Sequence, residues 1–258
     1  MNSFIIELTG FNIVIMLISA VLGILSFVGG VFILNKVPAT WLCDYDETPS
    51  EEMLSGKRFK GAFVYITGSV LSAVAFALIY LIYGATIYTP ILMALTFLLT
   101  MIILSDCKYF IIPDQFVIFS GILSLVFAYY DFFNKQYVIT SWWSPLVGGL
   151  SVAVLIIIVN LITILIAKKD GMGFGDVKLF GAIGIATGFP GVGIALLVAV
   201  LIAFLIILLT IIINKVRKKE TENYIPFGPS ICIGVYIVVV LQQVVSHLIS
   251  LYFSLFMK

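Results

Sequence analysis

The sequence predicts an all-α, polytopic integral membrane protein of about eight transmembrane helices. Of its 258 residues, 62% are hydrophobic and only 10% are charged, whereas soluble domains carry about 25% charged residues. A water-soluble fold cannot bury this much apolar surface, and apolar runs of about 20 residues, the length that crosses a bilayer, recur along the chain. The formal net charge is +1, which creates no global field for nucleic acid. We therefore expect a lipid bilayer, and no nucleic acid, among the partners.

Eight apolar runs are the expected membrane spans, and each is bounded by polar residues or by glycine and proline. They are residues 11–34, 62–83, 88–104, 115–133, 145–167, 179–189, 191–213 and 230–256. The sixth run is short and glycine-rich, so it either tilts in the bilayer or merges with the seventh. The boundary between the second and third runs is soft, because only Gly84 to Pro90 separate them.

The basic residues gather on one side of this arrangement. If the loop 35–61 is cytoplasmic, the loops 105–114, 168–178 and 214–229 fall on the same side. These four segments hold 12 of the 14 Lys and Arg residues, an asymmetry that fits the positive-inside rule. We therefore expect a multi-pass protein of the cytoplasmic membrane with both termini outside.

Two aspartates stand at the predicted cytoplasmic ends of spans. Asp106 directly follows the third run, and Asp176 directly precedes the sixth. Carboxylates are costly near hydrocarbon, so such residues are functional hypotheses by default. When two carboxyl groups share a site, the ionised one can activate a water and the protonated one can donate to a carbonyl, which is the chemistry of aspartic peptidases. The alternative is that each is a helix cap or a solvated loop residue.

Three short motifs resemble the signatures of the type IV prepilin peptidases. Residues 105–114 read SDCKYFIIPD and resemble the first signature, an Asp followed by Ile-Pro-Asp or Ile-Pro-Asn. Residues 173–179 read GFGDVKL and are similar to the second, Gly-x-Gly-Asp followed by Val/Ile-Lys-Leu. Residues 225–229 read IPFGP and resemble a Pro-Phe-Gly-Pro turn before the last helix. The resemblance covers residues 90–235 well and is looser upstream, where residues 38–45 look like the N-terminal cytoplasmic segment of the family.

The resemblance implies a catalytic pair, Asp106 and Asp176. The second acidic position of the first signature varies to Asn in the family, so Asp106 carries over rather than Asp114. Asp114 follows Pro113 and begins a helix, so we expect it to be an N-cap. The remaining signature residues are expected to support the site: Gly173, Gly175, Lys178, Pro113, Asp114, Pro226, Gly228 and Pro229. Glycines before Asp176 leave room for a substrate backbone.

The implied activity is cleavage of the short basic leader of prepilins and pseudopilins at the cytoplasmic membrane face. The N-terminal helices with their cytoplasmic loop (35–61) are then residues 1–85, and the membrane-embedded aspartic peptidase domain is residues 86–258. No cofactor is expected for cleavage. Many members also methylate the new N-terminus with S-adenosylmethionine and carry two zinc-binding CxxC pairs in the first loop. Here Cys43 stands alone in that loop, so no metal is expected, and S-adenosylmethionine is needed only if methylation is retained.

Several alternatives stay open at this point. Gly-x-Gly-Asp alone is shared with presenilin-like and signal-peptide-peptidase-like proteases. A proton-coupled transporter would require carboxylates at mid-membrane depth, whereas Asp106 and Asp176 lie at the predicted cytoplasmic end. Lys108 and Lys178 flank the aspartates, and each either lowers the pKa of a neighbouring carboxyl group or reaches toward lipid headgroups. We favour the headgroups, with Lys178 the better functional candidate because it belongs to a signature.

Overall fold

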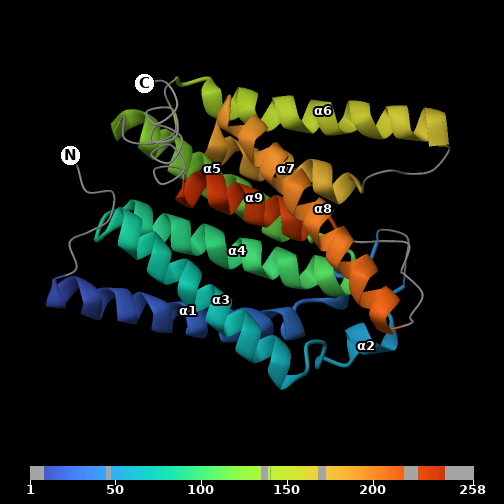
Figure 1. Ribbon diagram of the computed structural model, residues 1–258, viewed down its shortest axis with the longest axis horizontal. Helices are drawn as coiled ribbons and strands as arrows, with labels where there is room; N and C mark the ends of the chain where they lie inside the picture. The colour runs from blue at the N-terminus through green and yellow to red at the C-terminus, as the bar shows by residue number, and fades with distance from the viewer. Residues whose placement is uncertain are drawn as a thin grey trace.

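The computed structural model describes residues 9–44, 48–134, 139, 141–167, 173–217 and 226–241. In this part of the chain the elements are all helical (Figure 1), which confirms the predicted fold class. They are α1 (Gly10–Lys36), the short 3₁₀ helix η1 (Ala39–Trp41), α2 (Glu51–Leu54), α3 (Ala62–Tyr83), α4 (Tyr88–Tyr109), α5 (Asp114–Asn134), α6 (Ser144–Ala167), α7 (Phe174–Thr187), α8 (Gly191–Arg217) and α9 (Gly228–Val240). The two termini, predicted to be external, and residues 242–256 of the last expected span lie beyond the described residues.

Six of the described helices are long and apolar enough to cross a membrane: α1, α3, α4, α5, α6 and α8. The protein is therefore a polytopic membrane protein. Helix α7 has 14 residues, a rise of about 21 Å, which is shorter than the hydrocarbon core of about 30 Å. Helix α9 is described over 13 residues. Helix α7 is thus separate from α8 and too short to span the bilayer unless the bilayer thins around it.

The structure shifts two helix ends that matter for the aspartates. Helix α4 continues to Tyr109 and stops where Phe110 adopts a left-handed conformation, with φ of 56°. Helix α7 begins at Phe174 after an extended Gly173. Asp106 therefore lies inside the last turn of α4, and Asp176 lies inside the first turn of α7, rather than in the flanking loops.

Successive long helices alternate in direction (Figure 1). The C-terminal ends of α1, α4, α6 and α8 and the N-terminal ends of α3, α5, α7 and α9 lie at the right-hand end of that view. The described parts of the four basic segments therefore lie at one end of the bundle, as the charge pattern predicted. The side of the membrane that this end faces is still a prediction.

Helix α9 connects the two helices that carry the aspartates. It packs against α4, α7 and α8, whereas α1 and α3 pack mainly on each other and on α4. Helices α5 and α6 cover the other side of α7. The buried side chains of α7 include Leu179, Phe180 and Ile183, each without exposed surface. The short helix is thus held in the centre of the bundle, with its N-terminus at the charged end.

A third buried carboxylate lies at the opposite end of the bundle. Asp131, near the end of α5, has no exposed surface. It accepts a hydrogen bond of 2.7 Å from the backbone N–H of Ile139, and its Oδ1 lies 3.3 Å from the hydroxyl of Tyr88. These contacts tie the connection after α5 to α4, so Asp131 has a structural role that the sequence pattern did not indicate.

Candidate active site

A cavity of about 550 Å³ opens where α4 ends and α7 begins. Its walls come from the first loop, from the α4–α5 connection, and from the start of α7, with one residue from the start of α9. The lining residues include Asp106, Asp114, Gly173, Gly175, Asp176 and Lys178. The structure therefore brings Asp106 and Asp176, which are 70 residues apart in the sequence, to one cavity.

The Asp106 carboxyl group is held by the start of α9. Asp106 is 4% exposed, and its Oδ2 accepts a hydrogen bond of 2.9 Å from the backbone N–H of Gly228. A Cβ atom at Gly228 would lie 2.6 Å from that same oxygen, so only glycine permits this approach. Because helix N-termini carry partial positive charge, the start of α9 also favours a carboxylate here.

Asp176 is held by the first turn of its own helix. It is the third residue of α7 and is 6% exposed. Its backbone N–H donates to the carbonyl of Gly173 at 3.1 Å, and the backbone of Gly173 in turn donates to the Asp176 carboxyl group. The contact from Gly173 is the acidic-residue half of a capping box, since Gly173 has no side chain to provide the other half. It fixes the carboxyl group at the positive end of α7.

The glycine before Asp176 has a packing role. A Cβ atom at Gly175 would lie 3.3 Å from Cβ of Ile112, in the connection that follows Asp106. The absent side chain therefore lets the α4–α5 connection pack against the start of α7. The sequence pattern suggested that this space serves a substrate backbone, whereas the structure places Ile112 next to it.

The two aspartates share an electrostatic environment. Their carboxyl groups lie close enough to repel each other when both are ionised. Among the described residues, the ion pairs at this end are Lys108–Glu52 and Lys178–Asp114, and neither includes Asp106 or Asp176. Backbone N–H groups at two helix N-termini, rather than cationic side chains, therefore stabilise negative charge on the pair.

Asp114 does not occupy the expected N-cap position. The carbonyl of Pro113 accepts the first helical hydrogen bonds of α5, from the N–H groups of Phe116 and Val117, so Asp114 is already the first helical residue. Its two carboxylate oxygens lie 2.9 and 3.1 Å from Nζ of Lys178. This ion pair joins the start of α5 to the start of α7 beside the cavity.

The favoured role for the flanking lysines was wrong. Instead of reaching toward headgroups, Lys178 pairs with Asp114, and Lys108 pairs with Glu52 at 2.6 Å and also donates to the carbonyl of Arg58. Both pairs join segments that are more than 50 residues apart in the chain. Sequence reasoning missed them because nothing local in the sequence relates Glu52 to Lys108.

The third signature supplies the glycine that contacts Asp106. Of this signature, residues 226–229 are described, and Pro226 precedes the helix while Pro229 lies in its first turn. Proline suits the start of a helix, because the backbone N–H group that it lacks would have no partner within the helix there. Phe227 lines the cavity. The motif therefore starts α9 and places the N–H of Gly228 next to the first signature.

The first loop forms a wall of the cavity that sequence reasoning did not predict. Thr40, Trp41, Cys43 and Asp44 all line it. The ring of Trp41 meets that of Phe116 edge-on, with centroids 6.4 Å apart. The resemblance of residues 38–45 to a family segment was the available signal, but it assigned no role to these side chains.

Comparison with known proteins gives one finding. Residues 92–212 match the model of the type IV leader peptidase family. The matched segment includes Asp106 and Asp176 and ends before the third signature. No curated protein and no solved structure matches the chain. The match covers slightly less than half of the 258 residues and supports a prepilin peptidase, and the long apolar helices make the chain a polytopic membrane protein.

Proposed function

We propose that this protein is an aspartic endopeptidase that removes the short basic leader of prepilins and pseudopilins. The observation that carries the proposal is that Asp106 and Asp176, both nearly buried, line one cavity. Other carboxylates lie nearby, but Asp114 is paired with Lys178. The family match supports the substrate class.

The proposed reaction uses one ionised and one protonated aspartate. Two carboxyl groups in a poorly solvated site favour sharing a single proton. The ionised group takes a proton from a water molecule as the water oxygen bonds to the scissile carbonyl carbon, while the protonated group donates to the carbonyl oxygen. Breakdown of the resulting diol breaks the C–N bond and passes a proton to the leaving amine. Gly228 and Gly173 hold the two carboxyl groups in place through their backbone N–H groups.

The proposed site faces the cytoplasm. The cavity lies at the end of the bundle where the described basic segments gather, and the positive-inside rule assigns that end to the cytoplasm. The hydrophobic helix of the substrate would remain in the bilayer, with only its cytoplasmic end reaching the cavity. This arrangement accounts for an active site at a membrane boundary.

Cleavage in this proposal needs neither metal nor cofactor. N-methylation would require S-adenosylmethionine. The lone Cys43 of the first loop does not provide the paired cysteines that methylating members often carry. We therefore limit the proposal to hydrolysis and let the experiment decide on methylation.

The test uses a purified prepilin and labelled S-adenosylmethionine with the wild-type enzyme, Asp106→Ala, Asp176→Ala and the isosteric Asn variants. Each aspartate variant should lose at least about 10²–10⁴-fold in cleavage, the usual contribution of a general acid or base. Glu51→Gln, which removes an exposed carboxylate of α2, is the matched control and should cleave normally. Full cleavage by either folded aspartate variant would refute the assignment. Label on the product would add methylation to the activity.

A further inference from the structure

Arg58 is a buried cation in a polar loop. It is 4% exposed, and its guanidinium group donates to three backbone carbonyls. Nε donates to Met53 at 2.6 Å, and Nη1 donates to Leu34 at 2.8 Å and to Val37 at 2.7 Å. A guanidinium stays charged in proteins, and burying a charge is costly unless it is well compensated. Arg58 therefore has a structural role beyond the positive charge that it adds to the loop.

The location of the guanidinium explains how the charge is compensated. Leu34 lies in the last turn of α1, and Val37 is its C-cap. The last carbonyls of a helix lack partners within the helix and carry partial negative charge. The Arg58 side chain satisfies two of these carbonyls and is attracted by the α1 dipole.

The same guanidinium holds together both ends of a segment that lines the cavity. Val37 precedes this segment and Met53, in α2, follows it, so the bonds to their carbonyls close residues 38–52 into a loop. The described part of this loop includes the cavity-lining residues Trp41 and Cys43. Compact loops whose ends are tied in this way present their side chains in a fixed position.

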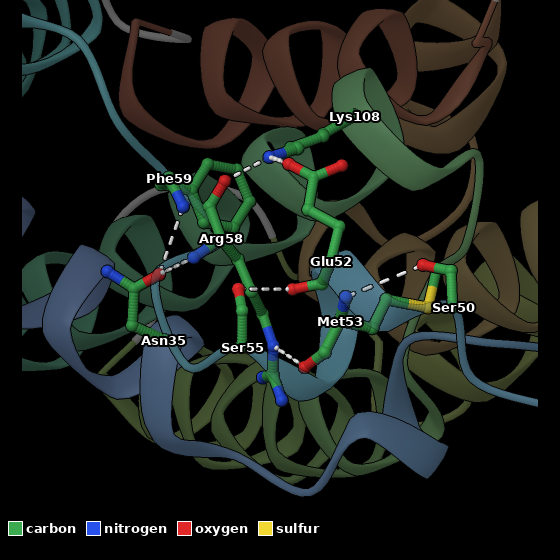
Figure 2. Close-up of polar contacts among 8 residues, drawn as sticks. All are labelled: Asn35, Ser50, Glu52, Met53, Ser55, Arg58, Phe59 and Lys108. Carbon is green, nitrogen blue, oxygen red and sulfur yellow. Dashed lines mark hydrogen bonds and ion pairs between the residues drawn. The ribbon is translucent and has the colours of Figure 1, made fainter.

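Backbone contacts around Arg58 attach the same loop to α1 and α4 (Figure 2). Oδ1 of Asn35 accepts from the N–H groups of Arg58 and Phe59, at 2.7 and 3.0 Å. The carbonyl of Arg58 accepts from Nζ of Lys108, which also pairs with Glu52. Arg58 is therefore the point at which α1, the loop and the end of α4 are joined.

We propose that Arg58 is a positioning residue of the active site. It holds the first loop closed, so that Trp41, Cys43 and their neighbours form one wall of the cavity. This role rests on the proposed peptidase function. Because the wall lines the cavity whereas the aspartates are held by α7 and α9, losing Arg58 should weaken substrate binding more than it slows the chemical step.

The activity test compares Arg58→Lys and Arg58→Met with Lys57→Met, which removes the neighbouring exposed cation. Both Arg58 variants should raise KM about tenfold, the effect of losing one hydrogen bond to a charged group, and leave kcat within about threefold. Lysine should not restore the wild-type KM. Its ammonium group lacks the planar guanidinium donors that reach the Met53 carbonyl on one side and the Leu34 and Val37 carbonyls on the other. Wild-type kinetics in Arg58→Lys, or a lower kcat at unchanged KM, would overturn the proposal.

A second readout does not depend on activity. Alkylation by N-ethylmaleimide is followed separately at each cysteine by mass spectrometry. Cys43 lies in the wall and is half-buried, whereas Cys232 is buried in α9. The Arg58 variants should label Cys43 about tenfold faster, by the same loss of a charged hydrogen bond, while Cys232 stays unlabelled. An unchanged Cys43 rate would overturn the proposal even if no prepilin were cleaved by any form of the enzyme.

If Cys232 becomes reactive, the Arg58 variants have unfolded and a milder change is needed. Asn35→Ala removes the acceptor of two loop N–H groups but keeps the guanidinium contacts. It should move KM and the Cys43 rate in the same direction by a smaller factor. Unchanged values for both in Asn35→Ala would then overturn the proposal.

Discussion

The backbone N–H of Gly228 donates to Oδ2 of Asp106 at 2.9 Å, across 122 residues of sequence. This bond links the first and third signature motifs and joins the N-terminus of α9 to the last turn of α4. Because α9 also packs against α7, the helix that holds Asp106 also contacts the helix that carries Asp176. The position of the two carboxyl groups therefore depends on how α9 begins.

Gly228→Ala should damage the site through sterics alone. The added Cβ atom would lie 2.6 Å from the Asp106 carboxylate, so either the helix start or the carboxylate must move. Overpacking of this kind costs about 1–3 kcal/mol of stability, and a misplaced catalytic group costs up to about 10²-fold in kcat. Cleavage kinetics and thermal unfolding in detergent measure the two effects.

The control for that change is Gly193→Ala. Gly193 lies in α8, and a Cβ atom there would meet nothing within 4 Å. The variant should keep wild-type activity and unfold at the same or a slightly higher temperature, because alanine favours a helix over glycine. Equal losses in both variants would contradict the specific role of Gly228.

Much of the fold could be predicted because the bilayer constrains it. Apolar runs located the long helices, and the distribution of basic residues predicted which helix ends lie together. The exact ends of α4 and α7 could not be predicted, because they depend on the left-handed Phe110 and on the capping by Gly173. The run predicted for α7, residues 179–189, began five residues too late for the same reason: the N-terminus of the helix is set by local capping at Gly173.

The site was only partly predictable. Sequence motifs identified the residues that line the cavity from α4 and α7, since the residues within each motif are adjacent in the chain. The contacts that join distant segments were not visible, including Gly228 to Asp106 and Lys178 to Asp114. Arg58 was counted only as one positive charge of a loop. Its burial depends on the tertiary contact between that loop and the end of α1.

Asp114→Asn should keep most of the activity. The side chain retains an acceptor for Lys178, and a partly exposed ion pair contributes about 0–1 kcal/mol, so kcat/KM should fall by less than about fivefold. Lys178→Met should have a similar effect, and the double variant should lose little more, because the two residues act as a pair. Loss of cleavage in well-expressed Asp114→Asn would identify Asp114, rather than Asp106, as the reacting carboxylate.

The Glu52–Lys108 pair should make stability depend on pH in the acidic range. Lys108 lowers the pKa of Glu52 by hydrogen bonding and by its charge. A carboxyl group whose pKa is lower when folded stabilises the fold above its unfolded pKa, and this stabilisation disappears as the pH falls through the folded pKa. Wild type should therefore melt slightly above Glu52→Gln at pH 7, and the two should converge below pH of about 4. Glu51→Gln, which removes the exposed carboxylate next to Glu52, should have the melting temperature of wild type at every pH. A difference between wild type and Glu52→Gln that grows as the pH falls would contradict the assignment.

The membrane side of the cavity can be tested with the natural cysteines. Cys43 lines the cavity, and Cys107 is exposed next to Asp106. A membrane-impermeant maleimide should label both from the cytoplasmic side, in inverted vesicles, and neither in right-side-out vesicles, because the positive-inside rule places this end in the cytoplasm. Trp142→Cys provides the matched control, since residue 142 is exposed and precedes α6 at the opposite end of the bundle. It should be labelled only in right-side-out vesicles. The reverse pattern for Cys43 and Trp142→Cys would invert the topology and place the aspartates on the outer face, where a cytoplasmic leader could not reach them.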